Sequence, residues 1–330
     1  MIEPYDVVSI IGNAKNAGKT TVLNYLLERM KKKVIGVSSI GMDGEPLDNV
    51  SFLPKPRIHL WPGTLVATAE MFLETATIGE KILKRTDIST PFGNIVVAEA
   101  VKPGNILVAG PSTIVDMEKI VRIFHEQGAQ KKFIDGAFAR QSTAKMADGT
   151  ILVSGANRSP VIDEVINDTE RAIRRLSIPK TEKNLLTRNE WKKTEIFDFE
   201  GNWIGASEHS AVMDPEATLG LLGPGVGFLY VPGATTAEFV RKFIKTKDAG
   251  MSKLVVYSPT NLIADDFIDV FPKAAEGRIQ TVRPVNIVAL CYNPFSPAGY
   301  VFDDNEFYER LRTLTDLPIF NVLSERNECR

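Results

Sequence analysis

Ten residues near the amino end of the chain combine a lysine, two threonines and a flexible backbone, which together suit phosphate chemistry. They are Gly12, Asn13, Ala14, Lys15, Asn16, Ala17, Gly18, Lys19, Thr20 and Thr21. Successive backbone N–H groups of such a loop can surround a phosphate group, and a helix that begins at its end adds partial positive charge. In this arrangement Lys19 would contact the β- and γ-phosphates, and the hydroxyl of Thr20 would ligate Mg²⁺. The segment therefore predicts a site for a nucleoside triphosphate with Mg²⁺.

The residues on either side of this loop have the patterns that the motif requires. Val7 to Ile11 is a short apolar run typical of a buried strand, and Thr20 to Met30 carries apolar residues at helical spacing. The common pattern is G-x-x-x-x-G-K-[ST], but Asn13 holds the position of its first glycine and Gly12 comes one residue earlier. A chance match in a turn is the alternative. The strand before the loop and the helix after it favour a phosphate-binding loop (P-loop).

Acidic and basic residues further along the chain are candidates for metal binding and catalysis. A P-loop needs a carboxylate at the end of a neighbouring strand for the Mg²⁺ shell, and Asp135 follows the apolar residues Phe133 and Ile134. Asp43 is a second candidate, either for Mg²⁺ or for activating water, although its glycine-containing segment also fits a plain loop. Arg140 would stabilise charge on a transferring phosphoryl group, unless it is an ordinary surface arginine. The predicted catalytic residues are Lys19, Asp43, Asp135 and Arg140, and the predicted metal ligands are Thr20, Asp43 and Asp135.

The order of the expected elements predicts an α/β protein with a mostly parallel P-loop sheet flanked by helices. A strand at 34–37 follows the first helix, which makes a β-α-β unit and hence parallel strands. Residues 47–109 interrupt this order as a β-rich insertion, with a hairpin expected over 92–111. The β-α-β order returns after it.

Three regions are expected along the chain. Residues 1–180 form the P-loop domain with its insertion, residues 181–214 form a linker with a second hairpin over 195–205, and residues 215–330 form a second α/β part. Whether that last part extends the first sheet or builds its own sheet is left open by the pattern.

Composition excludes several classes of function. The 330 residues include 39 Lys and Arg against 41 Asp and Glu, and this balance argues against a dedicated nucleic-acid binder. No run approaches the roughly 20 apolar residues of a membrane span, and the amino end does not resemble a leader, so a cytoplasmic location is expected. The two cysteines, Cys291 and Cys329, have no metal-site spacing, and Cys291 is expected in the core. The oligomeric state is open, and a homodimer is one alternative.

The loop Gly12-Asn13-Ala14-Lys15-Asn16-Ala17-Gly18-Lys19-Thr20 resembles that of the dethiobiotin synthetases and cobyrinic acid amide synthases, in which the first glycine is also displaced by one. This resemblance covers the first forty residues closely and the next hundred loosely. It implies a P-loop protein related to the signal recognition and nitrogenase iron proteins. Asp135 with Gly136 and Ala137 is similar to a Glu-Gly-Ala segment of the dethiobiotin synthetases, with Asp in place of Glu. The guanine-reading tetrapeptide Asn-Lys-x-Asp does not occur in the sequence, which favours ATP over GTP.

The loop and its flanks, from Val8 to Thr21, also look like those of the P-loop subunits of lysine aminomutase reactivases. That resemblance implies an ATPase that works beside a MutS-like ATPase to restore an adenosylcobalamin-dependent aminomutase. Residues 292–297 and the insertion would then contact partners. Two alternatives stay open: a synthase that activates a carboxylate by phosphorylation, and a nucleotide-dependent switch. Because the sequence contains no dedicated acid–base pair or nucleophile, the accessory ATPase and the switch are favoured.

The loop can be tested by changing its lysine. We expect Lys19→Ala to abolish ATP binding and to leave the fold intact, because the ammonium group is the main side-chain contact to the terminal phosphates. Calorimetric titration with ATP, together with circular dichroism, measures both effects. Unchanged affinity in this variant would contradict the prediction of a P-loop.

Overall fold

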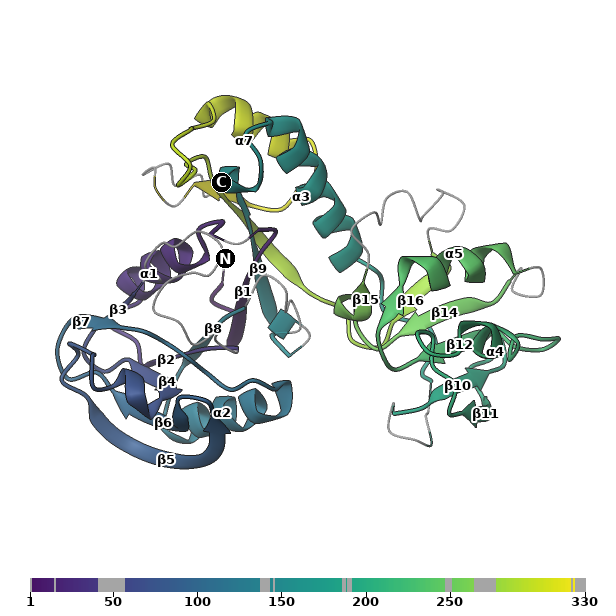
Figure 1. Cartoon of the computed structure of the whole chain (residues 1–330), viewed down its shortest axis with the longest axis horizontal. Helices are drawn as coiled ribbons and strands as arrows, with labels where there is room; N and C mark the ends of the chain where they lie inside the picture. Colours follow the sequence, from purple (N-terminus) through teal and green to yellow (C-terminus); the bar gives the residue numbers. More distant parts are fainter. Residues whose placement is uncertain are drawn as a thin grey trace. The chain divides into compact units, whose positions relative to one another are not determined.

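The computed structural model describes residues 2–14, 16–40, 57–136, 143–144, 146–185, 188, 192–246, 251–263, 277–321 and 323. They form an α/β protein that divides into two compact units (Figure 1). The first unit comprises Met1–Thr169 and Asn286–Arg330, and the second comprises Glu170–Val285.

A nine-stranded mixed sheet forms the centre of the first unit, in the order β18-β17-β9-β1-β8-β2-β4-β6-β5. Its strands are β1 (Val7–Gly12), β2 (Ile35–Ser39), β4 (Leu65–Ala69), β5 (Lys81–Thr90), β6 (Gly93–Glu99), β8 (Lys131–Asp135), β9 (Gly149–Gly155), β17 (Ile287–Asn293) and β18 (Ile319–Asn321). Neighbouring strands from β18 to β4 are parallel, whereas β6 is antiparallel to β4 and β5. The expected parallel order thus holds across the middle of the sheet and ends at β4.

Helices cover both faces of this sheet. The helices of the first unit are α1 (Lys19–Arg29), α2 (Ile114–Glu126), α7 (Asp304–Arg312) and the start of α3 (Ile162–Leu176), with short 3-10 helices at Glu70–Phe72 and Ala156–Arg158. Val8 and Ile10 of β1 pack in a core cluster with residues of α1, while Val7 packs in a separate cluster with residues of α2. Since alternate residues of a strand point to opposite faces, α1 and α2 lie on opposite sides of the sheet. Every residue of β1 is buried as a result, which explains its continuous apolar run.

The insertion region contributes strands to the sheet edge and a small separate pair. The short strands β3 (Ile58–Leu60) and β7 (Gly104–Ile106) pair with each other in antiparallel fashion. The hairpin expected over 92–111 is wrong: β6 pairs with β5 on one side and β4 on the other, and β7 pairs with β3. Because both edges of β6 are already hydrogen-bonded, β6 has no free edge for the chain that follows it.

The second unit contains its own five-stranded sheet in the order β11-β10-β12-β14-β16. Its elements are β10 (Thr194–Phe197), β11 (Trp203–Ser207), α4 (Pro215–Leu219), β12 (Phe228–Val231), β13 (Thr235–Thr236), α5 (Ala237–Lys245), β14 (Lys253–Val256), a 3-10 helix (Pro259–Asn261), β15 (Leu262–Ile263) and β16 (Ile279–Thr281). The hairpin expected over 195–205 is confirmed by the antiparallel pairing of β10 with β11. Phe239, Val240 and Phe243 of α5 pack in one cluster with Leu229 and Leu254 of the sheet.

The last third of the chain therefore divides between the two units. The strands and helices described between residues 215 and 285 belong to the second unit, whereas β17 returns to the first sheet beside β9 and β18 pairs with β17. This differs from the expectation of one α/β part over 215–330. The hairpin assigned to a linker also belongs to a sheet. Cys291 of β17 is buried as expected, and its burial raises the pKa of the thiol to about 12.

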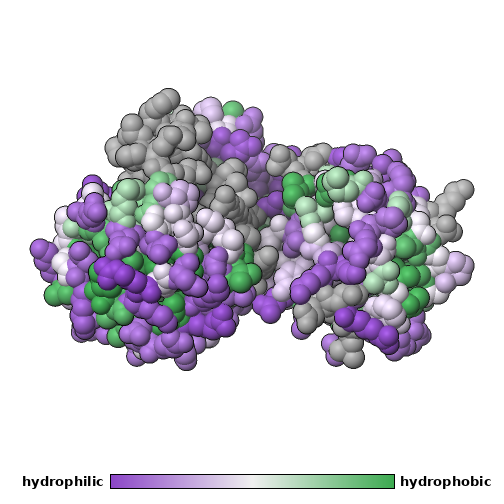
Figure 2. Space-filling view, turned by 60° about the horizontal axis from the view of Figure 1, so that its bottom comes forward, coloured by the Kyte–Doolittle hydropathy of each residue, from purple (hydrophilic) through white to green (hydrophobic). Residues whose placement is uncertain are grey.

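On the face seen in Figure 2, apolar side chains lie in small groups separated by polar ones. Among the described residues, the large apolar side chains with the greatest exposure are Met213 and Met251, at 80% and 81%. Within the described residues, no helix combines the length and hydropathy that crossing a membrane requires.

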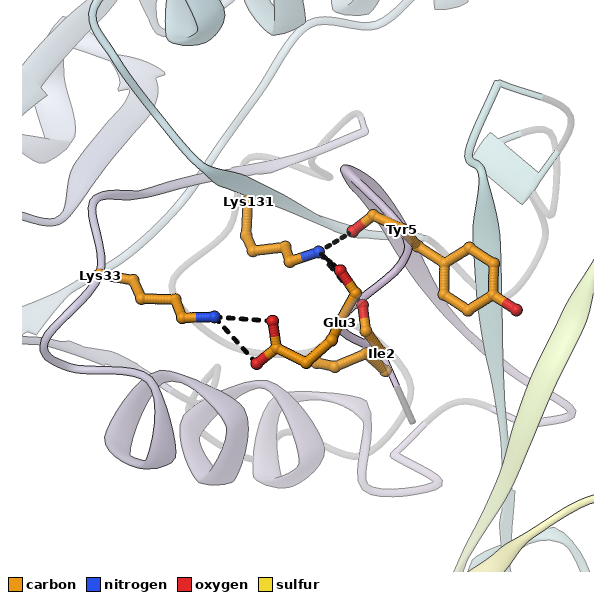
Figure 3. A network of polar contacts seen from close by, with 5 residues as sticks. All are labelled: Ile2, Glu3, Tyr5, Lys33 and Lys131. Atoms are coloured by element: carbon orange, nitrogen blue, oxygen red, sulfur yellow. Dashed lines mark hydrogen bonds and ion pairs between the residues drawn. The ribbon is translucent and has the colours of Figure 1, made fainter.

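A buried lysine ties the amino-terminal residues to the start of β8 (Figure 3). The ammonium group of Lys131 donates hydrogen bonds to the backbone carbonyls of Ile2, at 3.2 Å, and of Glu3 and Tyr5. The Lys131 side chain is almost fully buried. Nearby, Lys33 forms an ion pair with Glu3 at 2.7 Å, but these two side chains are 37% and 67% exposed. Burial therefore makes the bonds of Lys131 the stronger anchor.

These two lysines make a matched pair for a stability test. We expect Lys131→Met to lower the free energy of unfolding by on the order of 2 kcal/mol, because it removes the buried donor that three carbonyls share, of which only that of Ile2 also accepts from the N–H of Tyr5 among the described residues. Lys33→Met removes only an exposed ion pair and should have a much smaller effect. Urea denaturation of both variants measures the difference. Equal losses would contradict the anchoring role of Lys131.

Candidate functional site

The Gly12–Thr21 loop leaves the sheet at the end of β1 and leads directly into α1. Gly18, the residue before the helix, has φ 107°, and Asn16 has φ 59°. Both angles lie in the left-handed region that glycine and asparagine adopt most readily. These two residue types therefore permit the tight turn into α1. Lys15, a residue of the predicted phosphate loop, lies outside the described residues.

The first turn of α1 has the electrostatics of an anion site. Glycine has no side chain with which to cap the helix, and the residues Lys19, Thr20, Thr21 and Val22 include no acid. The first N–H groups of a helix have no partner within the helix, and the helix dipole adds partial positive charge there. Thr20 and Thr21 are half-buried at this position. The turn is thus suited to a phosphate group or another anion.

The end of β9 supports both ends of this loop. The N–H of Asn13 donates to the carbonyl of Val153 at 3.0 Å, which extends the pairing of β1 with β9. At the other end, Ala17 lies so close to Gly155 that a Cβ atom on Gly155 would be 2.6 Å from the Cα of Ala17. Only glycine allows this approach. The loop therefore rests on the last residues of β9.

Lys19 folds back across the start of the loop. A Cβ atom on Gly12 would lie 3.4 Å from both Cγ and Cδ of Lys19 and 3.1 Å from the carbonyl oxygen of Ala14. The aliphatic part of Lys19 thus runs over Gly12. The displaced glycine of the motif has a physical role here, because a Cβ atom at position 12 would press against the carbonyl oxygen of Ala14 and fill the space beside Lys19.

Asp135 ends β8, the strand next to β1. It is in register with Ile10 of β1 and with Ser39 of β2, and the N–H of Gly136 donates to the carbonyl of Ile10 at 2.9 Å. The carboxylate is thereby held at the same sheet edge as the loop. Asp135 was the acid that the sequence placed at a strand end, and its position at the end of β8 agrees with that prediction.

The Asp135 carboxylate is poorly solvated and faces positive charge. Burial raises its pKa from 3.8 to about 6, and the nearby ammonium group of Lys19 opposes this shift. Within the described part of the chain, its Oδ1 atom is buried and has no hydrogen-bond partner. A buried carboxylate oxygen without a donor is costly, so such an atom indicates a place for a cation or a proton.

Hydroxyl groups that sequence reasoning did not select also line this edge. The hydroxyl of Ser9 on β1 donates to Thr143 at 2.7 Å, and the hydroxyl of Ser39 at the end of β2 donates to the carbonyl of Val108 at 2.9 Å. Asn293, at the end of β17, packs beside Gly18, since a Cβ atom on Gly18 would be 3.3 Å from the Cβ of Asn293. A single polar residue within an apolar strand, such as Ser9 in β1, is the sequence pattern from which such a position could have been predicted.

The predicted site residues divide into two groups. Gly12, Lys19, Thr20 and Asp135 gather at one sheet edge, together with the rest of the described loop. Asp43 and Arg140 lie outside the described residues. Among the described residues no group of three or more His, Cys, Asp or Glu side chains could hold a metal ion by itself. Thr20 and Asp135 would therefore need oxygens from a ligand or water to complete a Mg²⁺ shell.

No protein-family model, curated protein or solved structure matches this chain.

The raised pKa of Asp135 makes stability depend on pH in a defined direction. In the unfolded chain its pKa is near 3.8 and in the folded chain it is about 6, so the folded state loses stability as pH rises between these values. We expect Asp135→Asn to be more stable than the parent at pH 7.5 without nucleotide or metal, by on the order of 1–3 kcal/mol.

This difference should be smaller at pH 5 than at pH 7.5, because the parent carboxyl group is then largely protonated. Urea denaturation at the two pH values measures it. Asp116→Asn serves as the control, because this half-buried acid on α2 has a pKa lowered by its bonds to Lys119 and Thr113, so its loss should change stability at pH 7.5 in the opposite direction. A parent protein that is more stable than Asp135→Asn at pH 7.5 would contradict the buried state of this carboxylate.

Proposed function

We propose that the protein binds ATP with Mg²⁺ at the Gly12–Thr21 loop and hydrolyses it. The observation that supports this most directly is the buried Oδ1 atom of Asp135, which lacks a partner in the described chain and lies close enough to Lys19 for its charge to lower the Asp135 pKa. A Mg²⁺ ion would compensate the buried carboxylate, and the ammonium group of Lys19 would compensate phosphate.

The residues present fit the proposed ligand. The N–H groups of the first turn of α1 would bind phosphate oxygens, Lys19 would contact the terminal phosphates, and Thr20 and Asp135 would hold Mg²⁺ directly or through water. When bound, Mg²⁺ neutralises charge that develops on the phosphoryl group. Lys19 would stabilise that same charge, and its aliphatic part lies beside Gly12 at the start of the loop.

Two further predicted residues, Asp43 and Arg140, belong to the proposal and lie outside the described residues. Asp43 would orient water or a Mg²⁺-bound water, and Arg140 would stabilise the transferring phosphoryl group. ATP is proposed rather than GTP because the sequence contains no Asn-Lys-x-Asp tetrapeptide. A cytoplasmic location, where ATP is available, belongs to the same proposal.

We propose that ATP hydrolysis serves the accessory role that the resemblance of the loop implies. The protein would act beside a MutS-like ATPase to restore an adenosylcobalamin-dependent aminomutase. A carboxylate-activating synthase and a nucleotide-dependent switch are the alternatives. The three roles differ in turnover. A reactivating factor hydrolyses ATP faster with its partners, a synthase consumes ATP in step with one metabolite, and a switch binds tightly and turns over slowly.

Metal dependence tests the role of Asp135. We expect Mg²⁺ to increase the stabilisation of the parent protein by ATP, and we expect Asp135→Asn to lose this increase while it still binds ATP through the loop. Its hydrolysis rate should fall by on the order of 100-fold, because the Mg²⁺ shell is incomplete. Thermal unfolding with ATP, with and without Mg²⁺, and phosphate release measure these effects.

Asp116→Asn on α2 and the surface variant Lys32→Ala provide controls for charge changes away from the loop, and both should keep the parent's response to Mg²⁺. Equal Mg²⁺ dependence in the parent and Asp135→Asn would contradict the metal site. Failure of the parent to bind ATP in either condition would contradict the proposed function as a whole.

A further inference from the structure

Beneath the Gly12–Thr21 loop lies a buried group of three polar side chains, one from each of three elements. Asn13 begins the loop, Ser154 lies on β9, and Thr169 lies on α3. Asn13 is 8% exposed, and Ser154 and Thr169 are fully buried. We call these three residues the Asn13 triad. A polar group in this position is unusual, because burial penalises each of these side chains unless it is hydrogen-bonded.

Three short contacts join the members of the triad, and a fourth joins Thr169 to the backbone of α3. The Nδ2 atom of Asn13 lies 3.2 Å from the Ser154 hydroxyl and 3.1 Å from the Thr169 hydroxyl, and the two hydroxyls are 2.7 Å apart. The Thr169 hydroxyl also donates to the backbone carbonyl of Val165, one turn earlier in α3, at 2.7 Å. The oxygen of Thr169 is therefore the shared centre of the network.

Counting hydrogens determines the orientation of the Asn13 amide. If the amide carbonyl faced the triad, only the two hydroxyl hydrogens would be available for the four contacts. With the NH₂ group facing inward, four hydrogens serve four contacts, so this orientation alone satisfies the network. The carbonyl oxygen of Asn13 consequently points away from the triad. That Oδ1 atom is buried and has no partner among the described residues.

The triad holds the loop at the residue where it leaves the sheet. The backbone N–H of Asn13 bonds to Val153 while its side chain bonds to the next residue, Ser154, and to α3. Both the main chain and the side chain of Asn13 are thus held, so the direction of the loop after Gly12 is defined on two sides. This also explains why asparagine stands where the common motif has glycine, because glycine has no side-chain amide that could donate a hydrogen bond to α3.

We infer that Thr169 is a positioning residue for the Gly12–Thr21 loop, acting through Asn13 and without contact to the ligand. The inference deepens the proposed function and rests on it for the identity of the ligand. The Thr169 hydroxyl accepts hydrogen bonds from Asn13 and Ser154 and donates one to the backbone of its own helix. Loss of this hydroxyl therefore releases the loop from α3. The loop then samples orientations in which its N–H groups no longer converge on one phosphate.

Three variants test this inference. Thr169→Val removes the hydroxyl with little change in volume, and Thr169→Ser retains it. The matched control is Thr150→Val, because Thr150 is a fully buried threonine on β9 whose hydroxyl has no partner among the described residues. We expect Thr169→Val to raise the Kd for Mg²⁺–ATP about tenfold, with KM rising more than kcat falls. Thr169→Ser should restore both values, and Thr150→Val should leave both unchanged.

A second readout needs no nucleotide. In the ligand-free protein, hydrogen exchange of peptides covering residues 12–21 should be about tenfold faster in Thr169→Val than in the parent, and normal in the other two variants. Ser154→Ala, which removes a different hydroxyl, should accelerate the same peptides if Thr169→Val does not fold. Parent-like exchange in the hydroxyl-free variants, or failure of Thr169→Ser to restore it, would overturn the inference. A parent protein that does not bind ATP would overturn only the proposed function, since the exchange result still decides the role of Thr169.

Discussion

The parallel pairing of β1 on both of its edges is the constraint on which the rest of the site depends. β8 lies on one side of β1 and β9 on the other, and all three run in the same direction. The carboxyl ends of parallel neighbours meet at one edge of a sheet, which is where ligands of α/β proteins commonly bind. Whatever follows β1 is consequently placed between the residues that end β8 and those that end β9. The loop, Asp135 and Gly155 lie together for this reason.

The two neighbours of β1 contribute in different ways. β8 contributes a charged group, the carboxylate of Asp135. Burial raises the pKa of this carboxylate, and Lys19 is close enough for its positive charge to oppose that rise. β9 contributes backbone contacts. The carbonyl of Val153 accepts a hydrogen bond from the loop, and Gly155 leaves room for Ala17. A carboxylate in this position costs free energy in the ligand-free protein, and such a cost is common where a protein is organised for a bound ion.

The Asn13 triad extends the same organisation away from the sheet edge. Its hydrogen bonds join the first loop residue to β9 and to α3, so the loop is fixed by side chains as well as by the sheet. Lys131 has a comparable structural role at the opposite end of β8, where its buried ammonium group holds three backbone carbonyls. Both are polar groups inside the protein that are satisfied almost completely, which is the condition for such groups to make a structure specific.

Much of the local structure follows from the sequence by itself. The apolar run of β1, the helical spacing of α1 and the glycines between them predict a strand, a loop and a helix, and the structure has all three because these are local preferences of the backbone. The α/β class and the hairpin of β10 and β11 were predictable for the same reason. Asp135 was predictable as the residue that ends a buried strand.

What could not be read from local patterns is which strands become neighbours. The antiparallel pairing of β6 with β4, the pairing of β3 with β7, and the return of β17 to the first sheet all join strands that are separated in the chain by other elements. The Asn13 triad brings together residues 13, 154 and 169, and the raised pKa of Asp135 arises from burial. Such contacts depend on long-range packing, which composition and spacing do not specify, so only the tertiary structure decided them.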